Sequence, residues 1–307
     1  MNVPNEAVIR INGLFKRYGS VNAVNGISLK IGKGEVFGLL GPNGAGKTTT
    51  LECLEGIRRA DGGILEIGGC DPQSDERSLR HILGVQLQSS SLPEGLRPAE
   101  AMSLICAWHG LPDRLDLLDR FGLTDQNRKQ YRELSEGQKR RLHLALALAC
   151  NPSAVILDEP TAGLDVQGRA QLHDAIRELK NSGVTVLLAT HDMAEAETLC
   201  DRVAIMIKGR IAVVGSPAQV TASGNPDVRI LLSTKNGCLQ PGMNTGNARF
   251  LRQTDNYGVW LSADAASAVM ELLKYVQAFS DTVEDLRVER PSLEERFLEL
   301  VEGGTRR

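Results

Sequence analysis

The sequence predicts an α/β fold with a mainly parallel sheet, because short apolar runs alternate with segments of helical pattern. Residues Glu35–Leu40, Ala154–Leu157 and Val184–Thr190 are runs of strand length, and continuous hydrophobicity is typical of strands buried on both faces. A glycine-rich loop follows the first run, and a helix is expected after it at Thr49–Ile57. A strand, such a loop and a helix in this order form the framework of a phosphate-binding loop.

The loop after the first strand has the pattern G-x-x-x-x-G-K-[ST]. Glycines let a backbone approach a ligand closely, and successive N–H groups at the start of a helix bind anions. In this pattern Lys47 can reach terminal phosphates and Thr48 offers a hydroxyl to Mg²⁺. A chance match to a glycine-rich turn rarely falls between an expected strand and an expected helix. We therefore expect a nucleoside triphosphate with Mg²⁺, held by Gly41, Pro42, Asn43, Gly44, Ala45, Gly46, Lys47, Thr48 and Thr49.

Composition narrows the class of protein. The 307 residues are 42% hydrophobic and 24% charged with a net charge of −3, so nothing predicts bulk attraction to nucleic acid or acidic lipid. The apolar runs fall short of the roughly 20 residues that a membrane-spanning helix needs, and the N-terminus has no signal-peptide pattern. Six scattered cysteines are expected to be reduced thiols of a cytosolic protein rather than disulfides or zinc ligands.

Further strands are expected around the loop. Val8–Ile11 and Gly26–Ile31 alternate like strands, and Tyr18 between them could either stack on a flat base or serve only in packing. Strands are also expected at Ile64–Ile67 and Ile82–Gln88, the latter ending in a glutamine.

The middle of the chain becomes helical and more polar. Short helices are expected at Ala99–Trp108 and Asp113–Phe121, and we interpret about residues 89–152 as a helical subdomain inserted into the α/β core. Ser135 and Gln138 have the S-x-x-Q spacing of a capping box, which predicts a helix start.

Two acids end one of the apolar runs. Asp158 and Glu159 follow Ala154–Leu157, and buried carboxylates are costly unless something balances them. Mg²⁺ on Asp158 and a proton-accepting role for Glu159 would do so; a helix-capping cluster is the alternative, although Pro160 favours a turn. His191 ends the next strand, so it is expected at the same sheet edge, where ligands of open α/β sheets bind. The other histidines are expected to be structural: His81, His109, His143 and His173.

The last third of the chain predicts a domain boundary. Asp165 is expected to cap a helix, and a hairpin is expected to turn at Lys208-Gly209. Residues 221–226 have linker composition, which divides the chain into domains 1–224 and 225–307. The second is expected to be a small α+β accessory domain, with strands and helices at Val228–Leu232, Ala248–Arg252, Gly258–Ser262, Ala265–Val276, Asp285–Val288 and after the capping box Ser292-x-x-Glu295.

In this order the motifs resemble the ATP-binding subunit of an ATP-binding-cassette (ABC) transporter over about residues 7–220. The most specific match is Leu134–Gln138, LSEGQ, to the ABC signature sequence, with Glu136 replacing the commonest glycine, a variant that the family tolerates. The resemblance implies a P-loop NTPase fold of ABC ATPase type: a mainly parallel core with an antiparallel β subdomain and an inserted helical subdomain.

The same resemblance implies a role for each matching residue. Tyr18 is similar to the aromatic residue that stacks on adenine, and Glu159 to the general base that polarises the attacking water. His191 is similar to the switch histidine at the γ-phosphate, and Lys47 acts on the phosphates. Mg²⁺ is assigned to Thr48, Asp158 and Gln88; Gln88 also senses the transmembrane partner. Ser135 and Gly137 complete the ATP site of a second cassette, Gln138 is a further candidate for nucleotide binding, and Asp165 belongs to the nucleotide-binding loop that pairs across the dimer.

No internal repeat is present, so a second ATP-binding subunit is implied, expected as a homodimer with a heterodimer left open. Residues 54–59 (LEGIRR) and 291–300 (PSLEERFLEL) resemble exporters of the daunorubicin-resistance type. This implies an ATP-hydrolysing subunit that powers an integral-membrane permease exporting drugs, lipids or polysaccharides. The subunit is then cytoplasmic and bound to the inner face of the membrane through the permease.

Two alternatives stay open. A soluble ABC ATPase acting on ribosomes or DNA usually has two cassettes or a long coiled-coil insertion, and neither is present here; no nucleic-acid partner is expected. A module that binds ATP without hydrolysing it is disfavoured by the intact Asp158-Glu159 pair and His191.

Overall fold

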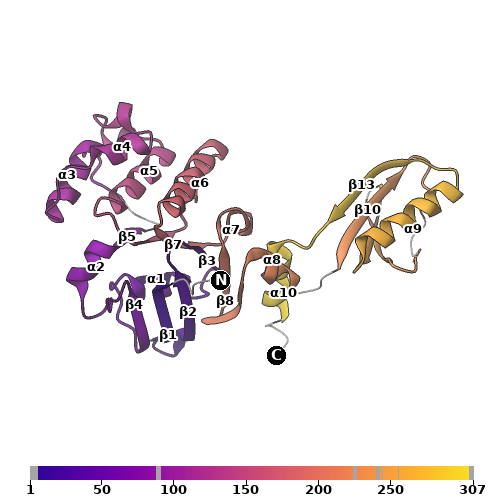
Figure 1. The fold of residues 1–307 in the computed structure, drawn as a ribbon, viewed down its shortest axis with the longest axis horizontal. Coiled ribbons are helices and arrows are strands. Elements are labelled where there is room, and N and C mark those ends of the chain that lie inside the picture. Colours follow the sequence, from indigo (N-terminus) through magenta and orange to yellow (C-terminus); the bar gives the residue numbers. More distant parts are fainter. Residues whose placement is uncertain are drawn as a thin grey trace. The chain divides into compact units, whose positions relative to one another are not determined.

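The computed structural model describes residues 6–87, 91–223, 227–239, 243, 245–254 and 256–303. The chain separates into two compact units, Met1–Pro217 and Ala218–Arg307, drawn in Figure 1. Each unit has its own hydrophobic cluster of buried side chains. The division between the compact units falls after Pro217, whereas the sequence predicted the domain boundary at 224/225. That domain boundary stays a prediction. The expected linker is wrong at its first two residues, because helix α8 (Pro217–Ala222) includes them; residues 224–226 lie outside the described part.

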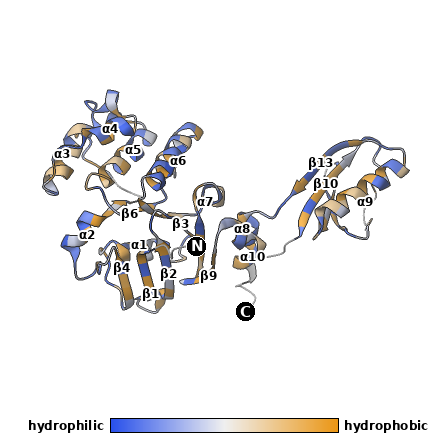
Figure 2. Ribbon diagram, viewed as in Figure 1, coloured by the Kyte–Doolittle hydropathy of each residue, from blue (hydrophilic) through white to orange (hydrophobic). Residues whose placement is uncertain are grey.

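A six-stranded sheet with the order β5-β6-β7-β3-β8-β9 forms the centre of the first unit. The strands β5, β6, β7, β3 and β8 run parallel, and β9 pairs antiparallel with β8. Every residue of β3, β6 and β7 is buried, and the sheet is rich in hydrophobic residues (Figure 2). This confirms the predicted parallel core. The bounds are β3 Val36–Leu40, β5 Leu83–Gln86, β6 Ala154–Asp158, β7 Thr185–Thr190, β8 Arg202–Ile207 and β9 Arg210–Gly215.

The register of the central strands brings their carboxyl ends together. Asp158 at the end of β6 pairs with Ala189 in β7, and Leu40 at the end of β3 pairs with Thr190. The segments that follow these three strands therefore leave the sheet from one edge, as the sequence predicted.

A three-stranded antiparallel sheet, β2-β1-β4, completes the core of the first unit. Its strands are β1 Ala7–Tyr18, β2 Val21–Gly32 and β4 Gly62–Ile67, which confirms the antiparallel subdomain. Their buried side chains join those of the central sheet in one cluster. The strand expected from Ile82 begins one residue later, because Ile82 ends helix α2 (Glu76–Ile82), and the helix expected at Thr49–Ile57 spans Lys47–Leu54 instead. The signal for α2 was readable, because Asp75 caps it by accepting a hydrogen bond from Ser78 N.

The helices of the first unit fall into two sets. Some pack against the sheets, and others form the helical subdomain expected at about residues 89–152. In Figure 1, α3, α4 and α5 lie together, and each contacts the other two. The predicted caps are present: Ser135 Oγ accepts from Gln138 N at 3.2 Å and Gln138 Oε1 accepts from Ser135 N at 2.9 Å. The helices are α1 Lys47–Leu54, α3 Pro98–Trp108, α4 Leu115–Arg120, α5 Glu136–Ala147, α6 Val166–Asn181 and α7 Met193–Leu199, with 3₁₀ turns at Thr124–Gln126 and Tyr131–Glu133.

The second unit is a four-stranded antiparallel sheet, β11-β12-β10-β13, with α9 packed on it (Figure 1). Trp260 is fully buried in its core, and its indole N–H donates to Met243 O at 2.8 Å. Nowhere in the described part is a helix both long and apolar enough to cross a membrane. The elements are β10 Val228–Thr234, β11 Arg249–Thr254, β12 Tyr257–Ser262, α9 Ala265–Ala278, β13 Val283–Glu289 and α10 Leu293–Gly303.

Candidate functional site

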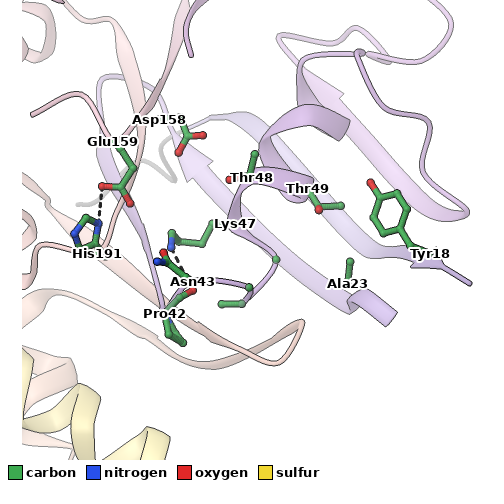
Figure 3. Close-up of a pocket in the computed structure, with 13 residues that line it drawn as sticks. Tyr18, Ala23, Pro42, Asn43, Lys47, Thr48, Thr49, Asp158, Glu159 and His191 are labelled. Atoms are coloured by element: carbon green, nitrogen blue, oxygen red, sulfur yellow. Dashed lines mark hydrogen bonds and ion pairs between the residues drawn. The ribbon is translucent and has the colours of Figure 1, made fainter. Parts of the chain in front are cut away.

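A cleft of about 360 Å³ opens at the carboxyl edge of the central sheet, shown in Figure 3. Its walls come from the end of β1, from β2, from the loop between β3 and α1, and from the segments after β6 and β7. The size is in the range of small-molecule sites. Lining residues are Tyr18, Ala23, Pro42, Asn43, Gly44, Ala45, Gly46, Lys47, Thr48, Thr49, Asp158, Glu159 and His191.

The glycine-rich loop is closely packed against its surroundings. Gly46 is the N-cap of α1, with a positive φ of 106°. A Cβ atom there would lie 2.3 Å from Ala23 O, and one on Gly41 would lie 2.4 Å from Met206 O. Real Cβ atoms do not come that close, so the loop requires glycine at both positions. Its N–H groups and the N-terminus of α1 can then face an anion.

Lys47 is folded back onto this loop. Its Nζ donates to Gly41 O at 2.7 Å, and the residue is only 7% exposed. Burial lowers the pKa of the ammonium, while the charges of Glu159 and Asp158 act in the opposite direction. The cleft therefore contains a buried cation held by carbonyl groups, which is suited to a phosphate.

Asp158 and Thr48 are neighbours in the same cleft. Asp158 is 4% exposed. Burial, followed by the charge of Glu159, raises the pKa of this carboxyl, while the charge of Lys47 and a hydrogen bond from the Thr48 side chain act in the opposite direction. A buried carboxylate beside a hydroxyl fits Mg²⁺, which takes a few protein oxygens and completes its shell with water and phosphate. Among the described residues no group of three or more acidic, histidine or cysteine side chains gathers to hold a metal by itself. Gln88, the third predicted ligand, lies outside those residues.

Glu159 and His191 are in direct contact. His191 Nδ1 lies 2.8 Å from Glu159 Oε2, and the glutamate side chain is 9% exposed while the imidazole is 64% exposed. Glu159 has a positive φ of 48°, which is uncommon for a residue with a side chain and occurs often at functional sites. Its N–H donates to Ala189 O at 2.9 Å, so β7 fixes this conformation. No pattern in the sequence predicted this backbone conformation.

Tyr18 lies at the mouth of the cleft with 40% of its surface exposed. Lys16 Nζ is 5.5 Å and the Arg58 guanidinium 5.4 Å from the ring centroid. An accessible ring in an electropositive setting can stack on a flat base. Ala23, which also lines the cleft, was not predicted, because a small strand residue carries no chemical signal.

Four predicted residues lie elsewhere. Ser135, Gly137, Gln138 and Asp165 line a separate hollow of about 340 Å³ and do not line the cleft. Here the N-termini of α5 and α6 are adjacent: a Cβ on Gly137 would be 3.8 Å from the Gly168 Cα. Two helix N-termini side by side favour an anion. Within one chain, the structure therefore does not bring the signature residues to the phosphate loop.

The remaining histidines do not line the cleft. Tyr131 Oη lies 2.9 Å from His143 Nε2, and burial lowers the pKa of this imidazole to about 4. The rings of His81 and His109 pack edge to face. His173 contacts Glu195.

The sequence of this chain is similar to that of several known proteins. The family model described as "ABC transporter" matches residues 24–162. The daunorubicin resistance ATP-binding protein DrrA3 of Streptomyces coeruleorubidus is 35% identical, over 98% of each chain. The linearmycin resistance ATP-binding protein LnrL of Bacillus subtilis is 30% identical, over 95% of this chain and 98% of that one. The Nod factor export ATP-binding protein I of Ralstonia nicotianae is 38% identical, over 69% and 68%.

A solved structure of an ATP-binding subunit of an ABC transporter is also similar. It has a TM-score of 0.65 and 27% identity, with 70% of this chain and 92% of that chain covered. Full-length similarity to DrrA3, the matching fold and the order of the motifs in the chain agree. The chain therefore belongs to the ABC transporter family, as one of its ATP-binding ATPase subunits.

Proposed function

We propose that this protein hydrolyses ATP to power a membrane permease that exports its cargo. The observation that carries the proposal is the Glu159–His191 contact of 2.8 Å within the cleft that also holds the phosphate loop. The names of similar proteins, which refer to drug resistance and to Nod factor export, support an exporter of drugs, lipids or polysaccharides. They do not favour action on ribosomes or DNA.

In this proposal ATP lies along the cleft from Tyr18 to His191. Adenine stacks on Tyr18 at the mouth, and the phosphates accept hydrogen bonds from loop N–H groups. Lys47 exchanges its bond to Gly41 O for the terminal phosphates. The desolvated ammonium gains a charged partner, which favours the exchange.

Thr48 and Asp158, with Gln88, would hold Mg²⁺. When bound, the ion supplies positive charge against the phosphate oxygens. The raised pKa of the Asp158 carboxyl supports this assignment, because a divalent cation would stabilise the charge that burial disfavours.

Glu159 accepts the proton of the attacking water. Its carboxylate is at the wall of the cleft, and its contact with His191 fixes which oxygen faces the ligand. Positioning of this kind is the main contribution of protein groups to phosphoryl transfer. His191, being exposed, remains accessible to the γ-phosphate.

A second copy of this chain completes each site. The hollow formed by Ser135, Gly137, Gln138 and Asp165 contributes two helix N-termini, yet it does not line the cleft of its own chain. Two copies arranged head to tail place each hollow against the other copy's phosphate loop. The sandwich then contains two ATP molecules.

The permease partner places the protein at the inner face of the cell membrane. A groove of about 660 Å³ between the core and the helical group is lined by Leu87 and Ser91, which flank Gln88 and its neighbours. Trp108 lines this groove with 63% of its surface exposed. An exposed aromatic residue beside a groove is typical of protein interfaces.

The proposal is tested by two measurements on the full chain. Purified protein should release phosphate from ATP only when Mg²⁺ is present. Affinity-tagged protein from membranes of the native host should retain a multi-pass membrane protein. A purified dimer without ATPase activity would contradict the motor role, and retrieval of ribosomes instead of a membrane protein would contradict the exporter role.

A further inference from the structure

Helix α7 begins two residues after His191, and its short length makes it dependent on its neighbours. It spans seven residues, Met193–Leu199, too few to be stable as an isolated helix. Asp192 links it to the preceding strand: Asp192 N donates to Thr190 Oγ1 at 3.0 Å, and its carboxylate accepts from Glu195 N at 3.0 Å. The position of His191 therefore depends on where α7 is held.

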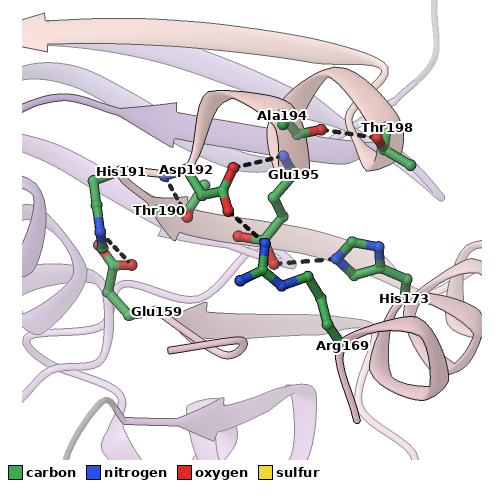
Figure 4. Close-up of polar contacts among 9 residues, drawn as sticks. All are labelled: Glu159, Arg169, His173, Thr190, His191, Asp192, Ala194, Glu195 and Thr198. Carbon is green, nitrogen blue, oxygen red and sulfur yellow. Dashed lines mark hydrogen bonds and ion pairs between the residues drawn. The ribbon is translucent and has the colours of Figure 1, made fainter. Parts of the chain in front are cut away.

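Two side chains of α6 hold α7, as Figure 4 shows. Arg169 Nη1 lies 2.9 Å from Asp192 Oδ2, and His173 Nε2 lies 3.5 Å from Glu195 Oε1. Arg169 and His173 are four residues apart and so share one face of α6. The two contacts attach consecutive turns of α6 to the N-cap and the first turn of α7.

The inner pair is the unusual one. The Glu195 side chain is fully buried and that of His173 is 12% exposed. No described residue donates a hydrogen bond to either carboxylate oxygen of Glu195. A buried carboxyl group without hydrogen bonds is costly, and the nearest basic group given for it is the imidazole of His173, whose Nε2 lies 3.5 Å away and makes no hydrogen bond to a described residue. Buried polar pairs of this kind add little stability over apolar packing but can fix a geometry.

The same helix α6 begins at the hollow described above. Asp165 caps it by accepting from Gly168 N at 2.7 Å, and both residues line the hollow that contains Ser135. The first turn of α6 thus forms part of the hollow that we propose faces the second copy. Further along the same helix, His173 contacts α7, which follows His191 in the chain.

We propose that His173 and Glu195 are positioning residues for His191. As a buried pair between α6 and α7 they hold the imidazole of His191 against Glu159 and link it to the Asp165 end of α6. The inference rests on the proposed function, because it assigns the pair to ATP hydrolysis. Neither residue touches the nucleotide cleft.

The test compares His173→Gln and Glu195→Gln with Glu178→Gln in the full chain. Glu178 is the matched control, an exposed carboxylate of α6 paired with Arg120. We expect both buried-pair variants to lower kcat about fivefold, with KM for ATP changed less than about twofold, because coupling of this size is typical between linked groups. The control should match the wild type.

A second comparison separates positioning from a general effect on folding. In a His191→Ala background, His173→Gln should cause no further loss of kcat, since the residue through which it acts is absent. Arg169→Gln removes the contact to Asp192, which is more exposed than the His173–Glu195 contact. Its effect on kcat, measured with His191 present and in the His191→Ala background, gives a second comparison with less risk of unfolding. Unchanged kcat in all three variants, or losses that multiply in the His191→Ala background, would overturn the inference.

Hydrogen exchange gives a readout that needs no ATPase activity. In nucleotide-free protein, Glu195→Gln should speed amide exchange over residues 193–199 and leave α1 unchanged. Wild-type protein without ATPase activity would count against the proposed function. Unchanged exchange over 193–199 would count against the pair alone.

Discussion

His191 Nδ1 lies 2.8 Å from Glu159 Oε2, although the residues are 32 positions apart in the chain. The contact exists because β6 and β7 are neighbours in register and because Glu159 adopts a positive φ that turns its side chain into the cleft. Figure 3 shows both side chains beside Asp158 and Lys47. The proposed proton acceptor is thus held by the residue expected to contact the γ-phosphate.

Glu159→Gln should bind ATP normally and hydrolyse it slowly. The amide preserves size and can still contact His191, but it cannot accept the proton, so kcat should fall by about 10² to 10⁴. Single-turnover hydrolysis and fluorescent-ATP binding measure the two effects. Glu178→Gln is the control. Near-normal hydrolysis by Glu159→Gln would remove the residue from the role of base.

Gly46→Ala should abolish ATP binding and destabilise the first unit. Its new Cβ would meet Ala23 O at 2.3 Å, whereas a Cβ on Gly44, also at positive φ, meets no atom within 4 Å. We expect Gly44→Ala to lower the free energy of unfolding by about 1–2 kcal/mol, the cost of a left-handed backbone conformation for a residue with a Cβ atom. Gly46→Ala should lower it by more, because the Cβ also clashes. Thermal unfolding of both variants measures the difference. Equal effects would contradict the close packing of the loop.

The stability of the nucleotide-free protein should fall as pH rises towards neutrality, and Glu55 should be one cause. Burial, with smaller contributions from Asp158 and Glu52, raises the pKa of this carboxyl from 4.5 to about 7. Between these values the folded state binds more protons than the unfolded chain, so stability decreases as pH rises and levels off above pH 7.

Glu55→Gln should remove this dependence. At pH 8 the variant should be more stable than the wild type by up to about 3 kcal/mol, and at pH 5 by less than about 1 kcal/mol. Denaturant unfolding at both pH values measures this difference, with Glu66→Gln, whose side chain is 34% exposed, as the control. An equal effect at the two pH values would show that Glu55 does not titrate in this window.

Gly258→Ala should destabilise the second unit without impairing ATP binding. A Cβ there would lie 2.2 Å from Cη2 of the buried Trp260, whereas a Cβ on Gly246 makes only ordinary contact. Overpacking of this kind costs about 1–3 kcal/mol. Tryptophan fluorescence in a Trp108→Phe background follows the second unit, with Gly246→Ala as control. Loss of ATP binding in parallel would show that the two units unfold together.

The parallel core and the cleft could be predicted from sequence because their signals are local. Continuous apolar runs predict β6 and β7, and a fixed spacing predicts the loop around Lys47. The positive φ of Glu159 and the Glu195–His173 pair were not predicted. They depend on which strands and helices become neighbours, and a lone histidine on a helix carries no sign of a buried partner.

The mass of Glu159→Gln in solution, measured by sedimentation velocity with and without Mg·ATP, tests most directly whether two copies close around the nucleotide. We predict a single-chain particle without nucleotide and a two-chain particle at saturating ATP, because each cleft needs the α5 tip of another copy. Adding Ser135→Arg should abolish the ATP-dependent species. A single-chain particle at saturating ATP would contradict the proposal that two copies close around the nucleotide.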